Sequence, residues 1–442
     1  MIQEIKEINL FLRILKHADL SGNAYLSYDY LKVFLKYNPP KCFLCFCLKD
    51  AEEKVIGLLP LTKMGLCYEI LGYRASNYLG YICAKENTAR VDSEISEYIK
   101  TNHSGMVINF YDINSATPLY AILKDLPFTS FARLYDCPFV DVDQDFETLF
   151  TAQVKKSKKR TELRKFTNKV ETVGKVELFN IDDAESWNKD KALMPYIYGI
   201  HRERFKDVYI PDDLCLHKNE AYYTELFEGL VVKNKALLSI LTVDGVPVSF
   251  LYTVISDGVV MDWMPAFDPA FSKYSLGTVH LMKLFEYLCQ NPRYRILDFS
   301  KGAAVYKARW AKDKTYNYMF VRRYSGSLIP WIKSSCKVFP ITLKNFLRRT
   351  GILKKIKSII VKLRNGPSPN IQNESASSFD IVKEFPAGVK ETAFSYSKIA
   401  KAPISVKSQV LSAIYAGAKP SLAYSENNLC FIMVNESSVE GL

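Results

Sequence analysis

Polar and titratable residues gather where an apolar stretch ends, between Leu297 and Trp310. Alternate side chains of a strand share a face, so Asp298 and Ser300 would project together from its end. Gly302 then allows a sharp turn, after which a Tyr-Lys pair and a Trp follow at helical spacing. A base, an acid and a cation beside one strand end suit group transfer from an ester or thioester. The stretch therefore predicts an active-site turn at a sheet edge.

The surrounding pattern predicts a mixed α/β (α+β) fold. Upstream of the turn we expect strands over 236–243, 246–255 and 259–265, a helix over 278–290 and a strand over 295–300. A helix that crosses between two strands brings the loops of the unit to one sheet edge. A second mixed pattern occupies the first 145 residues, with helices over 27–37 and 91–101 and strands over 42–48, 55–60 and 105–111.

The length of 442 residues is too great for one ordinary domain and predicts two or three. The formal charge of +12 is local, because residues 314–373 hold thirteen Lys and Arg and no acid. That stretch alone gives +13, so all other residues together sum to −1. The basic excess is therefore no nucleic-acid signature of the whole chain.

The C-terminal third divides by composition into three parts. Residues 327–365 form a basic amphipathic segment, in which the apolar and cationic positions of 352–364 fall on different helical faces. Such a helix suits peripheral contact with an anionic membrane surface, and it equally suits docking on the protein's own core. Residues 366–378 have linker composition, and 379–442 predict a small appended module whose role the sequence does not give.

Several classes of protein are excluded. The longest apolar run has seven residues, too few to span a bilayer, and the charged first residues do not fit a signal peptide. We therefore expect a soluble, cytoplasmic protein with reduced cysteines and, as an alternative, peripheral contact with the inner face of the membrane. Cys42, Cys45 and Cys47 lack a second ligand pair, so no metal is expected.

Three motifs resemble a known family. Residues 267–278 (Phe-Asp-Pro-Ala-Phe, then Tyr-Ser-Leu-Gly-Thr) and the Asp-Phe-Ser, Gly and Tyr-Lys-x-x-Trp series of 298–310 are similar to the cellulose-biosynthesis-type (CelD/BcsL) branch of the GNAT acyltransferases, relatives of the FemAB peptidyltransferases. Leu276 replaces the family's usual Pro, and Ser300 its usual Gly. Residues 76–80 resemble the family's Ser-Asp-Tyr-x-Gly turn, with Asn77 in place of the acid.

The resemblance implies two tandem GNAT-like halves, a degenerate one over 1–145 and an acyltransferase half over 146–326. It also implies acetyl-CoA or another acyl-CoA as donor and N- or O-acyl transfer to a cell-envelope or extracellular polysaccharide or its sugar-nucleotide precursor. We expect the first half to bind no donor, since no glycine turn precedes a helix there, and to wall the acceptor cleft.

The candidate residues fall into three groups. The predicted catalytic residues are Asp298 as base with Asp262 as a second candidate, Tyr306 as acid and Lys307 as the cation. The predicted donor cradle is the turn before a helix, where backbone N–H groups meet a pyrophosphate: Tyr274, Ser275, Leu276, Gly277 and Thr278. The predicted acceptor contacts, drawn largely from the resemblance, are Asn77, Tyr78, His201, Arg204 and Trp310. Capping, packing and solvated positions are the structural alternatives for each of these residues.

Two other functions remain open. One is FemAB-like transfer from aminoacyl-tRNA to a peptidoglycan precursor, which the basic helix expected at 155–169 would suit; nucleic acid is otherwise an improbable partner. The other is a non-catalytic GNAT scaffold at the membrane surface. Binding of acetyl-CoA would distinguish an acyl-CoA-dependent transferase from the non-catalytic scaffold.

Overall fold

The computed structural model describes residues 1–18, 20, 23–72, 75–127, 129–208, 215–302, 304–324, 326, 328–349, 379–382, 390–415, 419–424 and 430–435. One mixed sheet of twelve strands runs through the main body, in the order β1-β2-β3-β4-β5-β12-β6-β11-β10-β9-β8-β7. Its strands are β1 (Ile2–Ile5), β2 (Phe43–Lys49), β3 (Val55–Met64), β4 (Cys67–Ile70), β5 (Val107–Asn114), β6 (Thr129–Asp141), β7 (Val176–Ile181), β8 (Ala236–Val243), β9 (Val246–Ser256), β10 (Val259–Phe267), β11 (Ile296–Asp298) and β12 (Asp313–Arg323). The mixed α/β fold expected from the sequence is confirmed.

Strands β12 and β6 connect the two halves of the sheet. Strand β12 pairs with both β5 and β6, and β6 pairs in turn with β11. A strand from late in the chain therefore lies between two early ones, and an early strand lies beside a late one. The sheet is continuous across the predicted junction at 145/146, and the domain boundaries remain a prediction.

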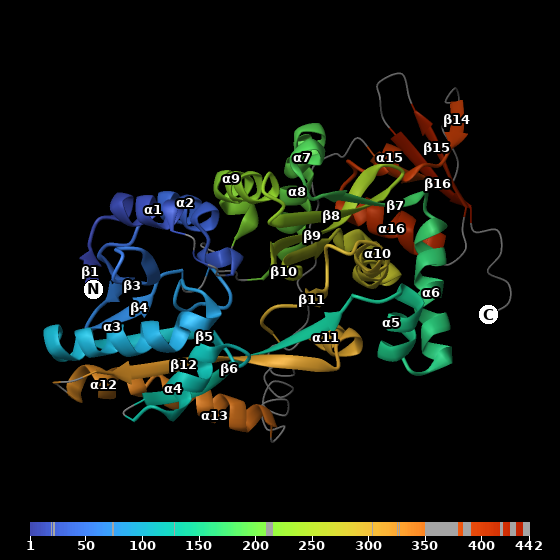
Figure 1. Cartoon of the computed structure of the whole chain (residues 1–442). Helices are drawn as coiled ribbons and strands as arrows, with labels where there is room; N and C mark the ends of the chain where they lie inside the picture. The colour runs from blue at the N-terminus through green and yellow to red at the C-terminus, as the bar shows by residue number, and fades with distance from the viewer. Residues whose placement is uncertain are drawn as a thin grey trace.

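Helices cover both faces of the sheet (Figure 1). The helices of the main body are α1 (Ile8–His17), α2 (Tyr28–Tyr37), α3 (Thr88–Asn102), α4 (Pro118–Asp125), α5 (Phe146–Gln153), α6 (Ser157–Glu171), α7 (Ala184–Asp190), α8 (Met194–Phe205), α9 (Glu220–Val231), α10 (Leu276–Gln290), α11 (Val305–Trp310), α12 (Leu328–Ser335) and α13 (Val338–Arg349). Helices α2 and α9 contact each other above one face, while α10 packs with α5 and α6 on the other. All eight residues of β8 are buried, as expected of a strand covered on both sides.

Local sequence explains where these helices begin and which face they bury. The side chain of Ser27 accepts a hydrogen bond from Tyr30 N at the start of α2. The stripe predicted for residues 278–290 is buried as expected, because Val279 and Phe285 face the sheet from α10. The segment 352–364 lies outside the described residues.

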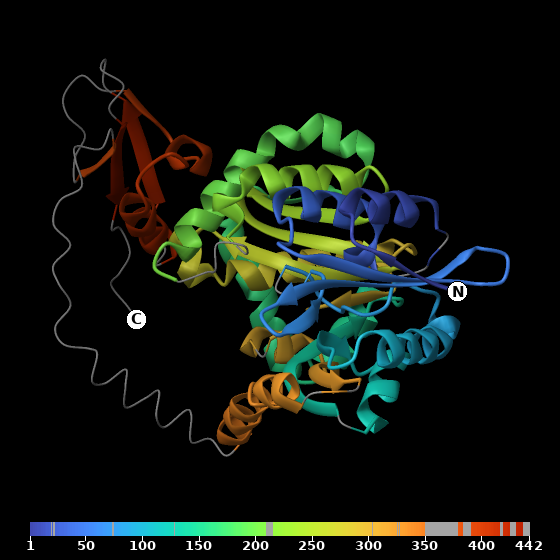
Figure 2. The same cartoon turned by 90° about the vertical axis from the view of Figure 1, so that its left-hand side faces the viewer.

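The C-terminal module forms a second, four-stranded sheet with two helices beside the main body (Figures 1 and 2). Its elements are β13 (Phe379–Val382), β14 (Lys390–Ala393), α15 (Tyr396–Ile399), α16 (Ile404–Tyr415), β15 (Lys419–Tyr424) and β16 (Cys430–Asn435). Helix α16 and the antiparallel pair of β15 and β16 lie within the stretch predicted as an appended module, 379–442. Apolar residues of the module share one cluster with residues of β8, β9 and α10.

Candidate active site

The parallel strands β10 and β11 lie at the centre of the second half and pair with each other at one end only. We call this arrangement the fork. Strands β10 and β11 pair over only three positions, the last of which joins Met261 to Asp298. Beyond this pair β10 continues to Phe267 without a partner in β11, and its pairing with β9 shifts register between Asp262 and Met264. Among the described residues, β10 beyond Met261 has no strand partner on its β11 side, and a bulge of this kind bends a strand.

Asp298 lies at the mouth of the fork and is partly exposed. Its Oδ2 accepts a hydrogen bond of 2.6 Å from the hydroxyl of Tyr78, and its Oδ1 accepts one of 2.7 Å from Ser300 N. Burial raises the pKa of Asp298 to about 6, although the Tyr78 hydrogen bond, the Ser300 N–H and the nearby Lys307 each lower it. A carboxylate with this pKa can accept a proton near neutral pH.

Asp262 and Lys307 are the buried charges beside Asp298. Burial raises the pKa of Asp262 to about 6 against the attraction of Lys307, and Asp298 raises it further. Among the described residues, Oδ1 of Asp262 has no hydrogen-bond partner. The ammonium of Lys307 donates to the backbone oxygens of Phe299 and Lys301, and burial lowers its pKa. Lys307 therefore holds the turn together and supplies positive potential to both acids.

Tyr306 and Trp310 are one helical turn apart on α11, as predicted, but their surroundings differ. Tyr306 is half-buried, and burial followed by the charge of Asp262 raises the pKa of its hydroxyl, which keeps it protonated. Trp310 is fully buried and stacks on Phe150 at 6.0 Å, with Phe285 at 5.2 Å. Its indole packs in the core cluster beneath α10.

The predicted donor cradle lies at the start of α10. Tyr274 and Leu276 are buried, whereas Ser275, Gly277 and Thr278 remain half-exposed. Ser275 adopts a left-handed conformation (φ 52°), and no side chain caps the helix. A Cβ at Gly277 would meet nothing closer than Phe267 at 3.7 Å, so the position is open. Uncapped N–H groups at a helix N-terminus favour a bound anion.

The first half reaches the fork through Tyr78. Tyr78 has a left-handed backbone (φ 56°), a costly conformation for an aromatic residue that surrounding structure must hold. Asn77 is buried and donates to the hydroxyl of Tyr25 at 3.3 Å. Lys301, just beyond the fork, forms an ion pair of 3.0 Å with Asp112 of β5. The two halves are thus joined directly at the candidate site.

The two predicted residues on α8 lie in different environments. His201 is buried beside His217, with 2.9 Å between their Nδ1 atoms, and burial followed by His217 lowers its pKa to about 4. Arg204 is exposed, and its guanidinium lies 4.9 Å from the ring centroid of Phe267. Because Phe267 is also the neighbour of Gly277, Arg204 lies on the side of the donor cradle.

Sequence reasoning placed Ser300 at the site but missed two other residues, Tyr25 and Cys137. Ser300 has φ 54°, which explains why the resembling family has glycine there. Tyr25 and Cys137 surround the Tyr78–Asp298 pair, and burial followed by Asp298 raises the pKa of Cys137 to about 12. The family pattern marked Ser300, whereas no local pattern marks Tyr25 or Cys137.

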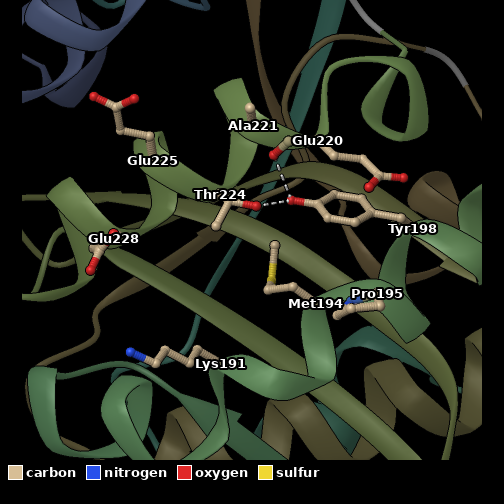
Figure 3. A pocket seen from close by; sticks show the side chains of 9 residues that line it. All are labelled: Lys191, Met194, Pro195, Tyr198, Glu220, Ala221, Thr224, Glu225 and Glu228. Atoms are coloured by element: carbon tan, nitrogen blue, oxygen red, sulfur yellow. Dashed lines mark hydrogen bonds between the residues drawn. The ribbon is translucent and has the colours of Figure 1, made fainter.

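A separate groove of about 710 Å³ lies between α8 and α9 (Figure 3). Tyr198 donates from within it to the backbone oxygen of Glu220 at 3.0 Å. Its lining includes none of the predicted site residues, and Glu225 at its edge pairs with Lys36. We therefore treat the fork as the candidate site.

The described part of the chain contains neither a membrane-spanning helix nor a cluster of metal ligands. No helix there combines the length and apolar character needed to cross a membrane. No three His, Cys, Asp or Glu side chains in those same ranges are grouped as a metal site would require.

One family model matches the part of the chain that contains both strands of the fork. Residues 157–308 match the family model described as "Acetyltransferase (GNAT) domain". Among curated proteins, no sequence matches the chain significantly.

Similar solved structures include three that cover about three quarters of this chain. L-PGS from Bacillus licheniformis has 13% identity and a TM-score of 0.46, over 75% of this chain and 96% of that one. FemX has 10% identity and a TM-score of 0.47, over 72% and 96%. A tandem GNAT protein from the clavulanic acid biosynthesis pathway has 10% identity and a TM-score of 0.38, over 74% and 100%.

Proposed function

We propose that this chain, a GNAT-type acyltransferase by its domain over 157–308, uses acyl-CoA, with acetyl-CoA as the first candidate, as its donor. The proposed acceptor is an amine or hydroxyl of a cell-envelope or extracellular polysaccharide or of its sugar-nucleotide precursor. The observation that carries the donor assignment is the open fork of β10 and β11 with an uncapped, half-exposed helix start at its end.

In this proposal the donor lies along the unpaired edge of β10. Its amides would bond to backbone groups of residues 262–267, and its pyrophosphate would meet the helix start at the N–H group of Gly277, since Thr278 N already donates to Ser275 O at 2.8 Å. Arg204, exposed beside Phe267, is placed to add a positive charge to the phosphates. Arg204, which the sequence predicted as a contact of the acceptor, is therefore proposed as a contact of the donor.

The proposed chemistry uses the groups at the mouth of the fork. Asp298 takes the proton of the attacking amine or hydroxyl, since its pKa of about 6 leaves it ionised at neutral pH. Tyr306, held protonated, supplies the proton to the leaving thiolate. Lys307 and the turn at Gly302 give the positive potential that favours charge on the carbonyl oxygen. Tyr78 and Asn77 wall the acceptor side.

A two-step experiment tests this proposal. Titration calorimetry with coenzyme A and acetyl-CoA first asks whether the protein binds the donor. Thiol release from acetyl-CoA is then followed with a panel of amino sugars, neutral oligosaccharides and sugar nucleotides. Binding together with acceptor-dependent thiol release would support the function. A protein that binds neither form of the coenzyme would overturn the donor assignment.

The alternative donor, aminoacyl-tRNA, is favoured by helix α6. Lys155, Lys156, Lys158 and Lys165 lie on or just before this helix, and all four side chains are exposed. Exposed like charges at this spacing suit a phosphate backbone. Gel-shift titration with total tRNA at two salt concentrations separates the readings, because a tRNA-dependent enzyme would bind charged tRNA and ignore acetyl-CoA.

We also propose peripheral contact of the protein with an anionic membrane. The sequence predicts this contact for 352–364, which lies outside the described residues. The neighbouring helices α12 and α13 expose large apolar side chains: Leu328, Ile329, Ile332, Phe339 and Leu343. They lie in the stretch of +13, so an anionic bilayer complements them in charge and polarity. Co-sedimentation with phosphatidylglycerol vesicles, lost with Ile329→Ser and Phe339→Ser together, would support the contact. Equal recovery with pure phosphatidylcholine vesicles would count against it.

A further inference from the structure

The C-terminal module, whose role the sequence left open, contacts the main body at the donor loop. The 3₁₀ helix η6 (Pro269–Tyr274) links the end of β10 to the cradle at 275–278. Helix α16 of the module packs on η6, and Phe271 of η6 meets Tyr396 of the module with ring centroids 5.0 Å apart. The module thus packs against the short segment that leads into the proposed pyrophosphate site.

Asp268 ties the first end of this segment to the module. Its Oδ1 accepts a hydrogen bond of 2.9 Å from Ala270 N, which starts η6. Its Oδ2 accepts one of 2.6 Å from the ammonium of Lys407 and one of 3.2 Å from the hydroxyl of Tyr396. Asp268 and Lys407 are each only 8% exposed, so solvent screens this ion pair little.

The other end of the segment is tied as well. The hydroxyl of Tyr274 donates a hydrogen bond of 2.6 Å to the backbone oxygen of Leu411 in α16. The ring of Tyr274 also meets Tyr415 at 5.3 Å. The next residue is Ser275, whose left-handed backbone turns the chain into α10. Both ends of η6 are therefore held by the module, while the cradle that follows stays half-exposed.

We propose that the C-terminal module is part of the donor site, as a brace that fixes residues 268–278 through Lys407 and Tyr396. These are positioning residues, since both act on the donor through Asp268, while Leu411 holds the other end of η6 at Tyr274. A cradle of backbone N–H groups binds an anion well only when its turn is already ordered, because ordering it on binding would cost affinity. The identity of the ligand, an acyl-CoA, rests on the proposed function, whereas the bracing of residues 268–278 by the module does not.

The module offers a matched control at another of its attachments to the main body. Ser395 donates to Oδ2 of Asp244 at 2.7 Å, in the turn between β8 and β9. Ser395→Ala therefore weakens the docking of the same module without touching η6. Lys407→Met removes the cation and leaves Asp268 buried and unpaired, and Lys407→Arg restores the charge.

The experiment measures loop order and donor binding separately in the full chain. With Lys407→Met we expect backbone amides of 268–279 to exchange at least tenfold faster and coenzyme A affinity to fall about tenfold. The turnover number should change less than twofold, Lys407→Arg should recover most of the affinity, and Ser395→Ala should leave both quantities near wild type. If Lys407→Met fails to fold, Tyr274→Phe tests the same brace by removing only the bond to Leu411.

Two outcomes would overturn the brace. One is exchange of 268–279 that is no faster in Lys407→Met than in Ser395→Ala. The other is unchanged coenzyme A affinity in Lys407→Met when the wild type binds. If the wild type does not bind coenzyme A, the proposed donor fails, and the exchange rates still decide whether the module orders the loop.

Discussion

The two halves of the sheet each contain a fork of parallel strands. The chain itself fills the first fork, whereas the second stays open. In the first half β4 and β5 pair at Tyr68 and Glu69 only, and in the second β10 and β11 pair over three positions. Each fork carries one carboxylate at its last pair, Glu69 in the first and Asp298 in the second. A helix connects the two strands of each fork, α3 between β4 and β5 and α10 between β10 and β11.

The first fork is filled by its own chain. Beyond β4, Ile82 forms an antiparallel bridge with Leu58 of β3, so the connecting loop returns to the sheet beside β3. The tip of that loop carries Tyr78, which crosses to Asp298 of the second fork. The second fork keeps its strand edge and helix start open, and the C-terminal module braces it from outside. In our proposal the same topology yields a donor site in the second half and a wall of the acceptor cleft in the first.

The largest effect should follow Asp298→Asn. Loss of the general base should lower the turnover number about 10²–10⁴-fold, while the melting temperature at pH 7 should not fall, because burial already penalises the ionised carboxyl. The matched change in the other fork is Glu69→Gln, which should leave turnover within twofold. Acceptor-dependent thiol release checks both, and equal activity of the two variants would contradict the assignment of the base.

Gly277→Val should come next. The position has ordinary backbone angles and room for a Cβ, so the variant should fold, and its side chain should cover the N–H groups of the cradle. We expect coenzyme A to bind at least tenfold more weakly, as measured by calorimetry. Gly229→Ala in α9, where a Cβ also meets nothing within 4 Å, is the control. Unchanged binding heats in the Val variant would remove the cradle from the proposal.

Tyr78→Phe should have a smaller effect, of about tenfold or less on turnover, and it tests whether the first half contributes to the site. The Tyr78 hydroxyl lowers the pKa of Asp298, so its removal should raise that pKa. The rising limb of the pH–rate profile should then move to higher pH. Tyr81→Phe, which removes a bond to Asp92 within the first half, should reduce stability without moving the limb. Superimposable profiles for Tyr78→Phe and wild type would leave the first half as scaffold only.

The sequence predicted what is local and missed what is long-range. Strand β8 and helix α10 were predicted within two residues, because alternation and a helical stripe are read from neighbouring positions. The place of β12 between β5 and β6 was not predicted, since nothing in a strand names its partners. Helical spacing placed Trp310 one turn after Tyr306 but could not show that it turns into the core. The ion pair of Lys407 and Asp268 joins residues 139 apart, and no pattern reports it.

The smallest expected effect is a change of stability with pH in Asp262→Asn. The folded pKa of Asp262 is about 6, above its ordinary 3.8, so between these values the folded state binds more protons than the unfolded state. Stability therefore falls as pH rises from about 4 to 6, by roughly 2–3 kcal/mol for this group. Asparagine does not ionise, so the variant has no such loss of stability. The melting temperature of the variant, relative to wild type, should therefore be a few degrees higher at pH 7.5 than at pH 4.

The first half supplies the contrast for that measurement, in a buried carboxylate that does have a partner. Asp92 of α3 forms a buried ion pair of 2.6 Å with Arg322 of β12, so Asp92→Asn leaves an uncompensated cation and should destabilise the protein at pH 7.5. Opposite signs in the two variants, measured by thermal melting at both pH values, would mark Asp262 as an acid kept at a cost to stability, as catalytic groups often are. A loss of stability in Asp262→Asn at pH 7.5 would instead make Asp262 a structural partner of Lys307 and leave Asp298 as the only candidate base of the fork.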